Sequence, residues 1–202
     1  MTSVAEYYHL STVTMHACTM ERNVYGPTGP NWRCIKCGLA RRVSDGVDVQ
    51  IQERPSRIDK PLSFVSGVGI GIVWIPFLKA FCAETVGRDL ILGKITGSTG
   101  IVIKDWVTFQ GRHRVIVRGS TNAQYRQCET CLQWIYFAMG NRYLFPAPPK
   151  DADLMESDCH GLLVRKGALP DLEFGKWKNL WVDKLQVVDS PSDLLGDFER
   201  LI

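Results

Sequence analysis

The sequence predicts an α+β fold, with a mostly antiparallel sheet, few helices and an inserted ribbon that carries four cysteines. Three observations predict it. Short β-branched segments recur along the chain, one segment has a convincing helical period, and two Cys-x-x-Cys pairs lie far apart. The chain has 202 residues, which suits one domain. We therefore expect residues 1–202 to form a single domain.

In the first half of the chain, apolar and β-branched residues predict strands separated by turns. A first strand is expected within residues 1–20, which combine Tyr, Leu, Val and Met. Residues 25–33 are rich in Gly and Pro, which break regular structure, so a loop is expected there. Alternating valines and an isoleucine predict a strand within residues 43–52.

The most apolar stretch runs from Phe64 to Leu78. It is about 15 residues long, whereas a membrane helix needs about 20, and it contains three glycines and a proline. We therefore expect a buried element and a turn, and no membrane association.

Residues 75–85 are the best helix candidate. Pro76 is tolerated in a first turn, and Gly87 is a plausible stop. Four apolar side chains spaced i, i+1, i+4 and i+5 would share one face: Phe77, Leu78, Phe81 and Cys82. Cys82 is accordingly expected in the core.

Short strands are expected next at residues 101–103, 106–109 and 114–118, where β-branched and aromatic residues gather. Residues 134–139 are apolar, but their pattern does not distinguish a strand from a helix. Three prolines within residues 146–152 predict a linker-like break.

Residues 151–202 are expected to form the acidic C-terminal part of the same domain. The segment carries 11 acidic and 6 basic side chains, a net charge of −5, whereas the rest of the chain carries +8. Strands are expected at residues 162–165 and 185–188, with a loop at Gly167 and a short helix starting near Ser190. The uneven charge can steer a partner but is too mild to indicate nucleic-acid binding.

Two cysteine pairs carry the chemistry of this sequence. Thiolates three positions apart can bind one tetrahedral zinc ion, and Gly38 allows the chain to turn after the first pair. Four thiolates leave no open coordination position, and closed sites are structural. We therefore predict one structural Zn²⁺ site, in a ribbon formed by the segments around residues 30–42 and 124–136, with the ligands Cys34, Cys37, Cys128 and Cys131.

The long separation of the pairs leaves alternatives open, because stand-alone ribbons space their pairs by about 15–20 residues. One alternative is a dithiol redox protein, although the first pair follows a Gly/Pro loop and no βαβ pattern surrounds it. Another is that the pairs are simply reduced cysteines. The third is a zinc-ribbon nucleic-acid-binding protein, which we consider the weaker partner class, suggested by Arg33, Lys36, Arg41, Arg42, Arg112, Arg114, Arg118 and Arg126.

No catalytic or phosphate-binding constellation is evident, so we expect no enzymatic activity. Cys159 and His160 are adjacent, but adjacent side chains usually point apart and no oxyanion motif frames them. The glycines of residues 67–71 lack the dinucleotide-binding spacing, and Gly93-Lys94 is followed by Ile95 where a P-loop needs Ser or Thr. Asp151 and Asp153 follow the Pro-rich break, where solvated carboxylates are expected.

Six tryptophans are many for a chain of this length. Trp177 and Trp181 lie four residues apart among lysines, which suits either a contact surface for a partner or two core anchors. We favour core anchors, because large aromatic side chains are mostly buried.

The cysteine pairs and their surroundings resemble the bacterial double-CXXCG motif family, which includes immunity proteins of contact-delivered polymorphic toxins. A Gly/Pro loop at residues 26–32 precedes the first CxxCG, and a long middle region separates it from the second CxxC. A Pro-rich stretch at 145–149 follows, and residues 151–154 lead into the apolar segment 162–165 ahead of a closing strand. The likeness covers most of residues 20–190, and only the cysteine spacing is sharp.

The resemblance implies a cytoplasmic protein that binds a cognate toxin and neutralises it by occlusion, without turnover. A rigid, zinc-stapled body would present the toxin-binding surface, and uneven charge would speed the encounter and reject wrong toxins. Only the four cysteines carry over residue by residue, so the contact surface stays undefined. Leu132 stands after the second pair where the first pair has Gly38. A cytoplasmic location also agrees with an N-terminus that lacks a basic region followed by an apolar one.

Overall fold

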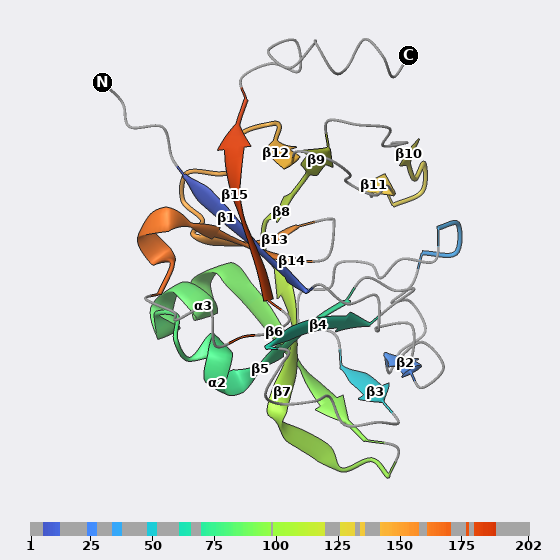
Figure 1. Ribbon diagram of the computed structural model, residues 1–202. Helices are drawn as coiled ribbons and strands as arrows, with labels where there is room; N and C mark the ends of the chain where they lie inside the picture. Colours follow the sequence, from blue (N-terminus) through green and yellow to red (C-terminus); the bar gives the residue numbers. More distant parts are fainter. Residues whose placement is uncertain are drawn as a thin grey trace.

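The fold is α+β, as predicted, with two sheets, a two-stranded hairpin and two short helices among the described residues (Figure 1). Antiparallel pairs predominate, and three of the described strand pairs are parallel. The computed structural model describes residues 6–12, 24–27, 34–37, 48–51, 61–65, 70–97, 99–119, 126–131, 134–135, 142–157, 161–170, 177 and 180–188.

The first sheet closes into a small barrel. Its order is β8-β13-β14-β1-β15-β12-β9, so β8 and β9 lie at opposite edges. Only Ile116 separates these two strands in sequence, and the two edges therefore meet at this segment. The strands are β1 (Tyr7–Thr12), β8 (Arg114–Val115), β9 (Val117–Gly119), β12 (Arg142–Leu144), β13 (Leu154–Ser157), β14 (Gly161–Arg165) and β15 (Leu180–Val187).

The second sheet has six strands in the order β2-β3-β6-β7-β5-β4. One of its faces carries a compact apolar cluster of Val49, Ile51, Ile70, Ile72, Ile95 and Trp106. The strands are β2 (Val24–Pro27), β3 (Val49–Ile51), β4 (Leu62–Val65), β5 (Ile70–Trp74), β6 (Leu90–Thr96) and β7 (Val102–Gly111).

The two sheets share a core. Strand residues alternate between faces, so β1 directs Leu10 outward from the barrel and Tyr7 inward. The interior cluster consists of Tyr7, Val115, Val117, Leu144, Ala152, Met155, Leu163 and Leu185. The shared core combines Leu10, Leu154, Leu162, Val164 and Leu180 of the barrel with Leu62, Val73, Phe77, Leu78, Phe81, Leu90 and Phe109.

The predicted helix over residues 75–85 is divided in two. Helix α2 (Ile75–Leu78) ends where Ala80 and Phe81 donate to carbonyls three residues back, and helix α3 (Ala83–Asp89) begins after Cys82, which has an extended backbone. Phe77 and Phe81 are buried, as the spacing predicted, with their rings edge to face at 5.7 Å. The prediction of a buried Cys82 was wrong, because the break between the helices turns its side chain to solvent.

Gly87 does not end the helix, which continues to Asp89. A Cβ atom at Gly87 would meet nothing within 4 Å. Because alanine restricts the unfolded chain more than glycine does, we expect Gly87→Ala to stabilise the protein by about 0.5–1 kcal/mol. Urea unfolding followed by circular dichroism measures this change, and an unchanged or lower midpoint would contradict it.

Gly161 differs from Gly87 because it leaves no space for a side chain, so the same substitution by alanine can be compared at the two positions. A Cβ atom there would lie 2.3 Å from His9 Nε2 and 2.6 Å from the carbonyl oxygen of Leu10. The carbonyl belongs to the neighbouring strand β1 and cannot move without breaking the pairing. We expect Gly161→Ala to destabilise the protein by about 1–3 kcal/mol in the same urea assay. A variant that unfolds at the wild-type midpoint would show that β1 and β14 can separate freely.

Several other sequence predictions need correction. The loop expected over residues 25–33 was wrong at its start, because Tyr25 to Pro27 belong to strand β2, in which Gly26 and Pro27 pair with β3. The strands expected at 101–103 and 106–109 are one continuous strand, β7. The strand expected at 114–118 is divided at Ile116, where its two parts join different partners.

The remaining strand predictions hold where the structure describes them. Strands β1 and β3 lie within the expected segments, β14 starts one residue and β15 five residues earlier than expected, and residues 134–135 form a strand. The helix expected near Ser190 lies outside the described residues. Within the described part of the chain, no helix has the length and apolarity of a membrane span.

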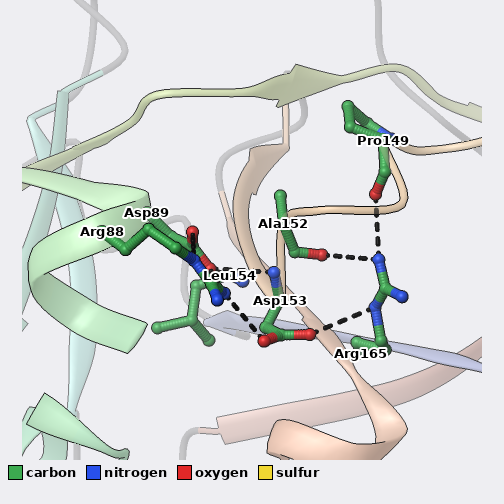
Figure 2. Close-up of polar contacts among 7 residues, drawn as sticks. All are labelled: Arg88, Asp89, Pro149, Ala152, Asp153, Leu154 and Arg165. Carbon is green, nitrogen blue, oxygen red and sulfur yellow. Dashed lines mark hydrogen bonds and ion pairs between the residues drawn. The ribbon is translucent and has the colours of Figure 1, made fainter. Parts of the chain in front are cut away.

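A polar network fastens α3 to the barrel (Figure 2). The buried Asp89 accepts hydrogen bonds from the backbone N–H groups of Asp153 and Leu154, at 2.8 and 2.9 Å. Arg88 binds both oxygens of Asp89 and reaches Asp153 at 2.7 Å. Arg165 lies 3.2 Å from Asp153 and donates to the carbonyls of Pro149 and Ala152. The expectation that Asp153 is merely solvated was therefore wrong.

Candidate metal centre

The four cysteines of the two Cys-x-x-Cys pairs come together in space, as predicted. All four Sγ atoms lie within 4.8 Å of one another. The Sγ atoms of Cys34 and Cys128 are 3.8 Å apart, and those of Cys37 and Cys131 are 3.5 Å apart. Each of these contacts joins residues separated by 94 positions, so the cluster connects two distant segments of the chain.

Each pair lies in a tight turn. The second pair closes a hairpin in which β10 (Arg126–Gln127) pairs with β11 (Trp134–Ile135). The first pair lies in the segment between β2 and β3, where residues 35–37 form a turn, as residues 129–131 do at the second pair. The second pair makes its turn although Leu132, not Gly, follows it; Leu132 itself lies outside the described residues.

The first thiol of each pair accepts matching hydrogen bonds from its own turn. Backbone N–H groups of Cys37 and Lys36 point at the sulfur of Cys34, and those of Cys131 and Thr130 point at the sulfur of Cys128. These N–H donors stabilise the thiolate form against the effect of burial, so the pKa of Cys34 falls to about 6 and that of Cys128 is also lowered. Both turns thus favour the thiolate, which is the form that binds metal.

The sulfur geometry fits a tetrahedral metal ion. A Zn–S bond of about 2.3 Å in a regular tetrahedron places neighbouring sulfurs about 3.8 Å apart. The separations of 3.5 and 3.8 Å across the two segments lie at or near this value. The donor set is four thiols with no oxygen or imidazole ligand within the cluster. This arrangement can hold one soft or borderline cation in a closed site.

Exposure divides the cluster into an inner and an outer pair. Cys34 and Cys128 are buried, whereas Cys37 and Cys131 are half-buried. The residues between the cysteines face solvent, and Ile35 at the tip of the first turn is 93% exposed. One edge of the centre therefore faces solvent and the opposite edge faces the protein.

The other candidate residues do not form a second site in the described part of the chain. Cys82 is exposed beside α3, far in sequence from any other cysteine. Cys159 and His160 lie outside the described residues. Gly93 and Lys94 lie within strand β6 rather than at a helix start, which agrees with rejecting a P-loop.

The two tryptophans near the C-terminus, Trp177 and Trp181, differ in burial. Trp177 packs edge to face against Trp74 and Phe77, with ring centroids 5.7 and 5.6 Å away, and so acts as a core anchor as expected. Trp181 is 50% exposed, so the expectation of a core position was wrong for this residue. It lies at the start of β15, opposite Ser11 of β1.

Sequence reasoning missed a buried polar pair inside the barrel. His9 Nε2 and Ser157 Oγ form a hydrogen bond of 2.7 Å, and both side chains are buried. They are 148 residues apart, so no local motif could have indicated the pair. Both side chains are buried, so the pair is part of the packing inside the barrel.

A search of protein-family models and of curated proteins finds no match to this chain.

Proposed function

We propose that the four cysteines hold one structural zinc ion, in a protein that binds a cognate bacterial toxin and neutralises it by occlusion. The observation that carries the zinc part is the convergence of four thiols within 4.8 Å of one another, with sulfur–sulfur distances of 3.5 and 3.8 Å across the two segments. Zinc is the ion that such sulfur-only closed sites most often bind. A closed site leaves no position for substrate, so the ion stabilises the fold and does not catalyse a reaction.

The toxin part of the proposal rests on the resemblance to the double-CXXCG family. The shared core and the closed barrel support it, because an inhibitor that works by occlusion needs a rigid surface. The ribbon adds to this rigidity by joining segments 94 residues apart. Such a protein would act in the cytoplasm of the cell that it protects.

Two observations favour a protein partner over nucleic acid. Arg114 lies 3.9 Å from the carboxylate of Glu156, and Arg118 donates to the carbonyl of Phe145 while its guanidinium stacks over that ring at 5.4 Å. Both arginines belong to the basic set that suggested nucleic-acid binding. Their intramolecular contacts leave them less available for phosphates.

The dithiol redox alternative receives less support from the local structure. Redox Cys-x-x-Cys pairs use the start of a helix to activate the first thiol. The second pair lies between strands β10 and β11, and the described residues 126–131 and 134–135 include no helix.

The zinc proposal is tested by measuring metal content on the purified, untagged protein. We expect about one zinc ion per chain in the wild type and none in Cys34→Ser or Cys128→Ser, because both segments share one site. Retention of zinc in either variant would contradict a shared four-cysteine site. Binding of iron or no metal in the wild type would contradict the choice of zinc.

The toxin proposal is tested separately, with the toxin encoded beside the gene of this protein. Co-expression should restore growth, and the purified pair should form a stable complex on gel filtration. A protein that binds zinc but neither binds nor protects against this toxin would contradict the toxin part and leave the zinc part intact. Salt-dependent binding of generic DNA or RNA would instead support the nucleic-acid alternative.

A further inference from the structure

The outer edge of the cysteine cluster contains one thiol from each segment. Each Cys-x-x-Cys pair combines a buried thiol, Cys34 or Cys128, with a half-buried one, Cys37 or Cys131. The two half-buried sulfurs lie 3.5 Å apart. An oxidant that approaches from solvent therefore meets two thiols that belong to different segments.

We propose that Cys37 and Cys131 are a peroxide-sensitive modification site, at which oxidation forms a disulfide between the two segments and releases the metal. The buried pair, Cys34 and Cys128, then forms the second disulfide. This inference rests on the proposed zinc site, because it takes the four-sulfur cluster as the starting state. It adds a covalent form of the ribbon in which two disulfides replace the metal ion.

The chemistry needs one hydroperoxide for each disulfide. One outer thiolate attacks the peroxide O–O bond, becomes a sulfenic acid and expels hydroxide. The other outer thiolate then attacks the sulfenic sulfur, forms the S–S bond and expels a second hydroxide. Two thiolates are oxidised by two electrons in total, and one peroxide is reduced to two hydroxides.

Exposure favours pairing between the segments, since all four Sγ atoms lie within 4.8 Å of one another and the two more exposed ones belong to different segments. The outer sulfurs must approach from 3.5 Å to a bond length of about 2 Å, and the inner sulfurs start at 3.8 Å. A pair within one segment would instead join an accessible thiol to a buried one, and would leave the two segments without a link. Disulfides between the segments keep the long loop closed after the metal has left, and long loops gain most from closure.

Protease cleavage sites between the cysteines allow the disulfide connectivity to be determined directly by peptide mapping. Trypsin cleaves after Lys36 and so separates Cys34 from Cys37, and cleavage after Glu129 separates Cys128 from Cys131. Each cysteine of the cluster thus lies in its own peptide. The metal-loaded wild type is treated with hydrogen peroxide, remaining thiols are alkylated in denaturant, and the double digest is mapped by mass spectrometry without reduction.

We expect the peptide pair Cys37–Cys131 to appear first, together with zinc release, followed by Cys34–Cys128 at higher peroxide. The oxidised, metal-free protein should melt above the reduced, chelated protein. Links within the segments, Cys34–Cys37 and Cys128–Cys131, or sulfinic acids without cross-links, would overturn the inference. Because the mapping uses the wild type, it does not depend on whether a cysteine variant folds.

A Cys82→Ser background removes the exposed thiol beside α3 and should leave the order of the cross-links unchanged. Metal content measured before oxidation reports on the zinc site, and peptide connectivity reports on the modification. If no zinc is found, the proposed zinc site fails. If zinc is found but the links form within the segments, only the present inference fails.

Discussion

Replacing Cys128 with serine is expected to destabilise the protein by at least about 3 kcal/mol, because it removes the metal together with one ligand. Structural zinc sites bind with free energies comparable to or larger than the whole stability of a domain. The ribbon residues described by the structure bury few apolar side chains of their own, and Ile35 is exposed. With the proposed zinc bound, the metal would be the main link between the segment at Cys34 and the hairpin at Cys128. Urea unfolding in the presence of zinc measures the effect.

Cys82→Ser is the matched control, since it makes the same chemical change at an exposed thiol outside the cluster. We expect its stability to stay within about 0.5 kcal/mol of the wild type. The double variant Cys34→Ser/Cys128→Ser should lose little more than either single variant, because each alone removes the metal. Additive losses would contradict a shared site, and a loss in Cys82→Ser equal to that in Cys128→Ser would indicate a general sensitivity to thiol removal.

The cluster of thiols could be predicted from the sequence because each Cys-x-x-Cys pair is a short motif that is recognisable by itself, although the two pairs lie far apart along the chain. Two Cys-x-x-Cys pairs in a reduced chain have one common use, and a tetrahedral ion needs four ligands whatever the separation. Several strands could also be predicted, since β-branched residues in alternation leave a period of two, but strands β4, β6, β12 and β13 were not predicted. The predicted antiparallel, helix-poor architecture follows from the same short strands and is confirmed.

Barrel closure could not be predicted, because it depends on long-range pairing. Residues 114–118 have the pattern of one strand, but Val115 pairs beside Ser157 and Val117 pairs beside Leu144. Nothing within the segment indicates that its two ends have different neighbours. The break after α2 was hidden for a similar reason, because the buried positions Phe77 and Phe81 satisfy a helical period whether or not the helix continues.

The exposure of Cys82 and the ion pairs of Asp153 show a further limit to predicting burial and contacts from sequence patterns. A periodic pattern predicts which side chains share a face only while the element continues, and α2 ends at Leu78. Asp153 follows a Pro-rich segment that has the composition of a solvated loop, yet Arg165 binds two carbonyls of that segment and fixes it against the barrel. The arginine that does so comes from β14, beyond the reach of local patterns.

Asp89→Asn is expected to destabilise the protein by about 2–4 kcal/mol, because it removes a buried, fully bonded carboxylate. One oxygen of Asp89 accepts the N–H groups of both Asp153 and Leu154, and Arg88 donates to both oxygens (Figure 2). An asparagine has only one oxygen, so its NH₂ group must face either the backbone donors or the guanidinium. Arg88 can recover water because its side chain is 52% exposed, whereas the side chain of Asp89 is only 3% exposed. Asp151→Asn, at an exposed carboxylate nearby, is the control and should change stability by less than about 0.5 kcal/mol.

The pH dependence gives Asp89→Asn a second, independent signature. Burial raises the pKa of Asp89, but the hydrogen bonds from Arg88, Leu154 and Asp153 outweigh it and leave the pKa below its ordinary value. A carboxyl group whose folded pKa is lowered contributes stability above its unfolded pKa, near 3.9, and loses that contribution as the pH falls through the folded value. Urea midpoints measured from pH 6 down to pH 2 should therefore fall less steeply below about pH 4 in Asp89→Asn than in the wild type. Glu6 also has a lowered pKa, about 2, through its bonds to Lys166 and Lys184, so part of the acid dependence should remain in the variant. Parallel curves for the two proteins would mean that the negative charge of Asp89 does not contribute to the stability of the contact between α3 and the barrel.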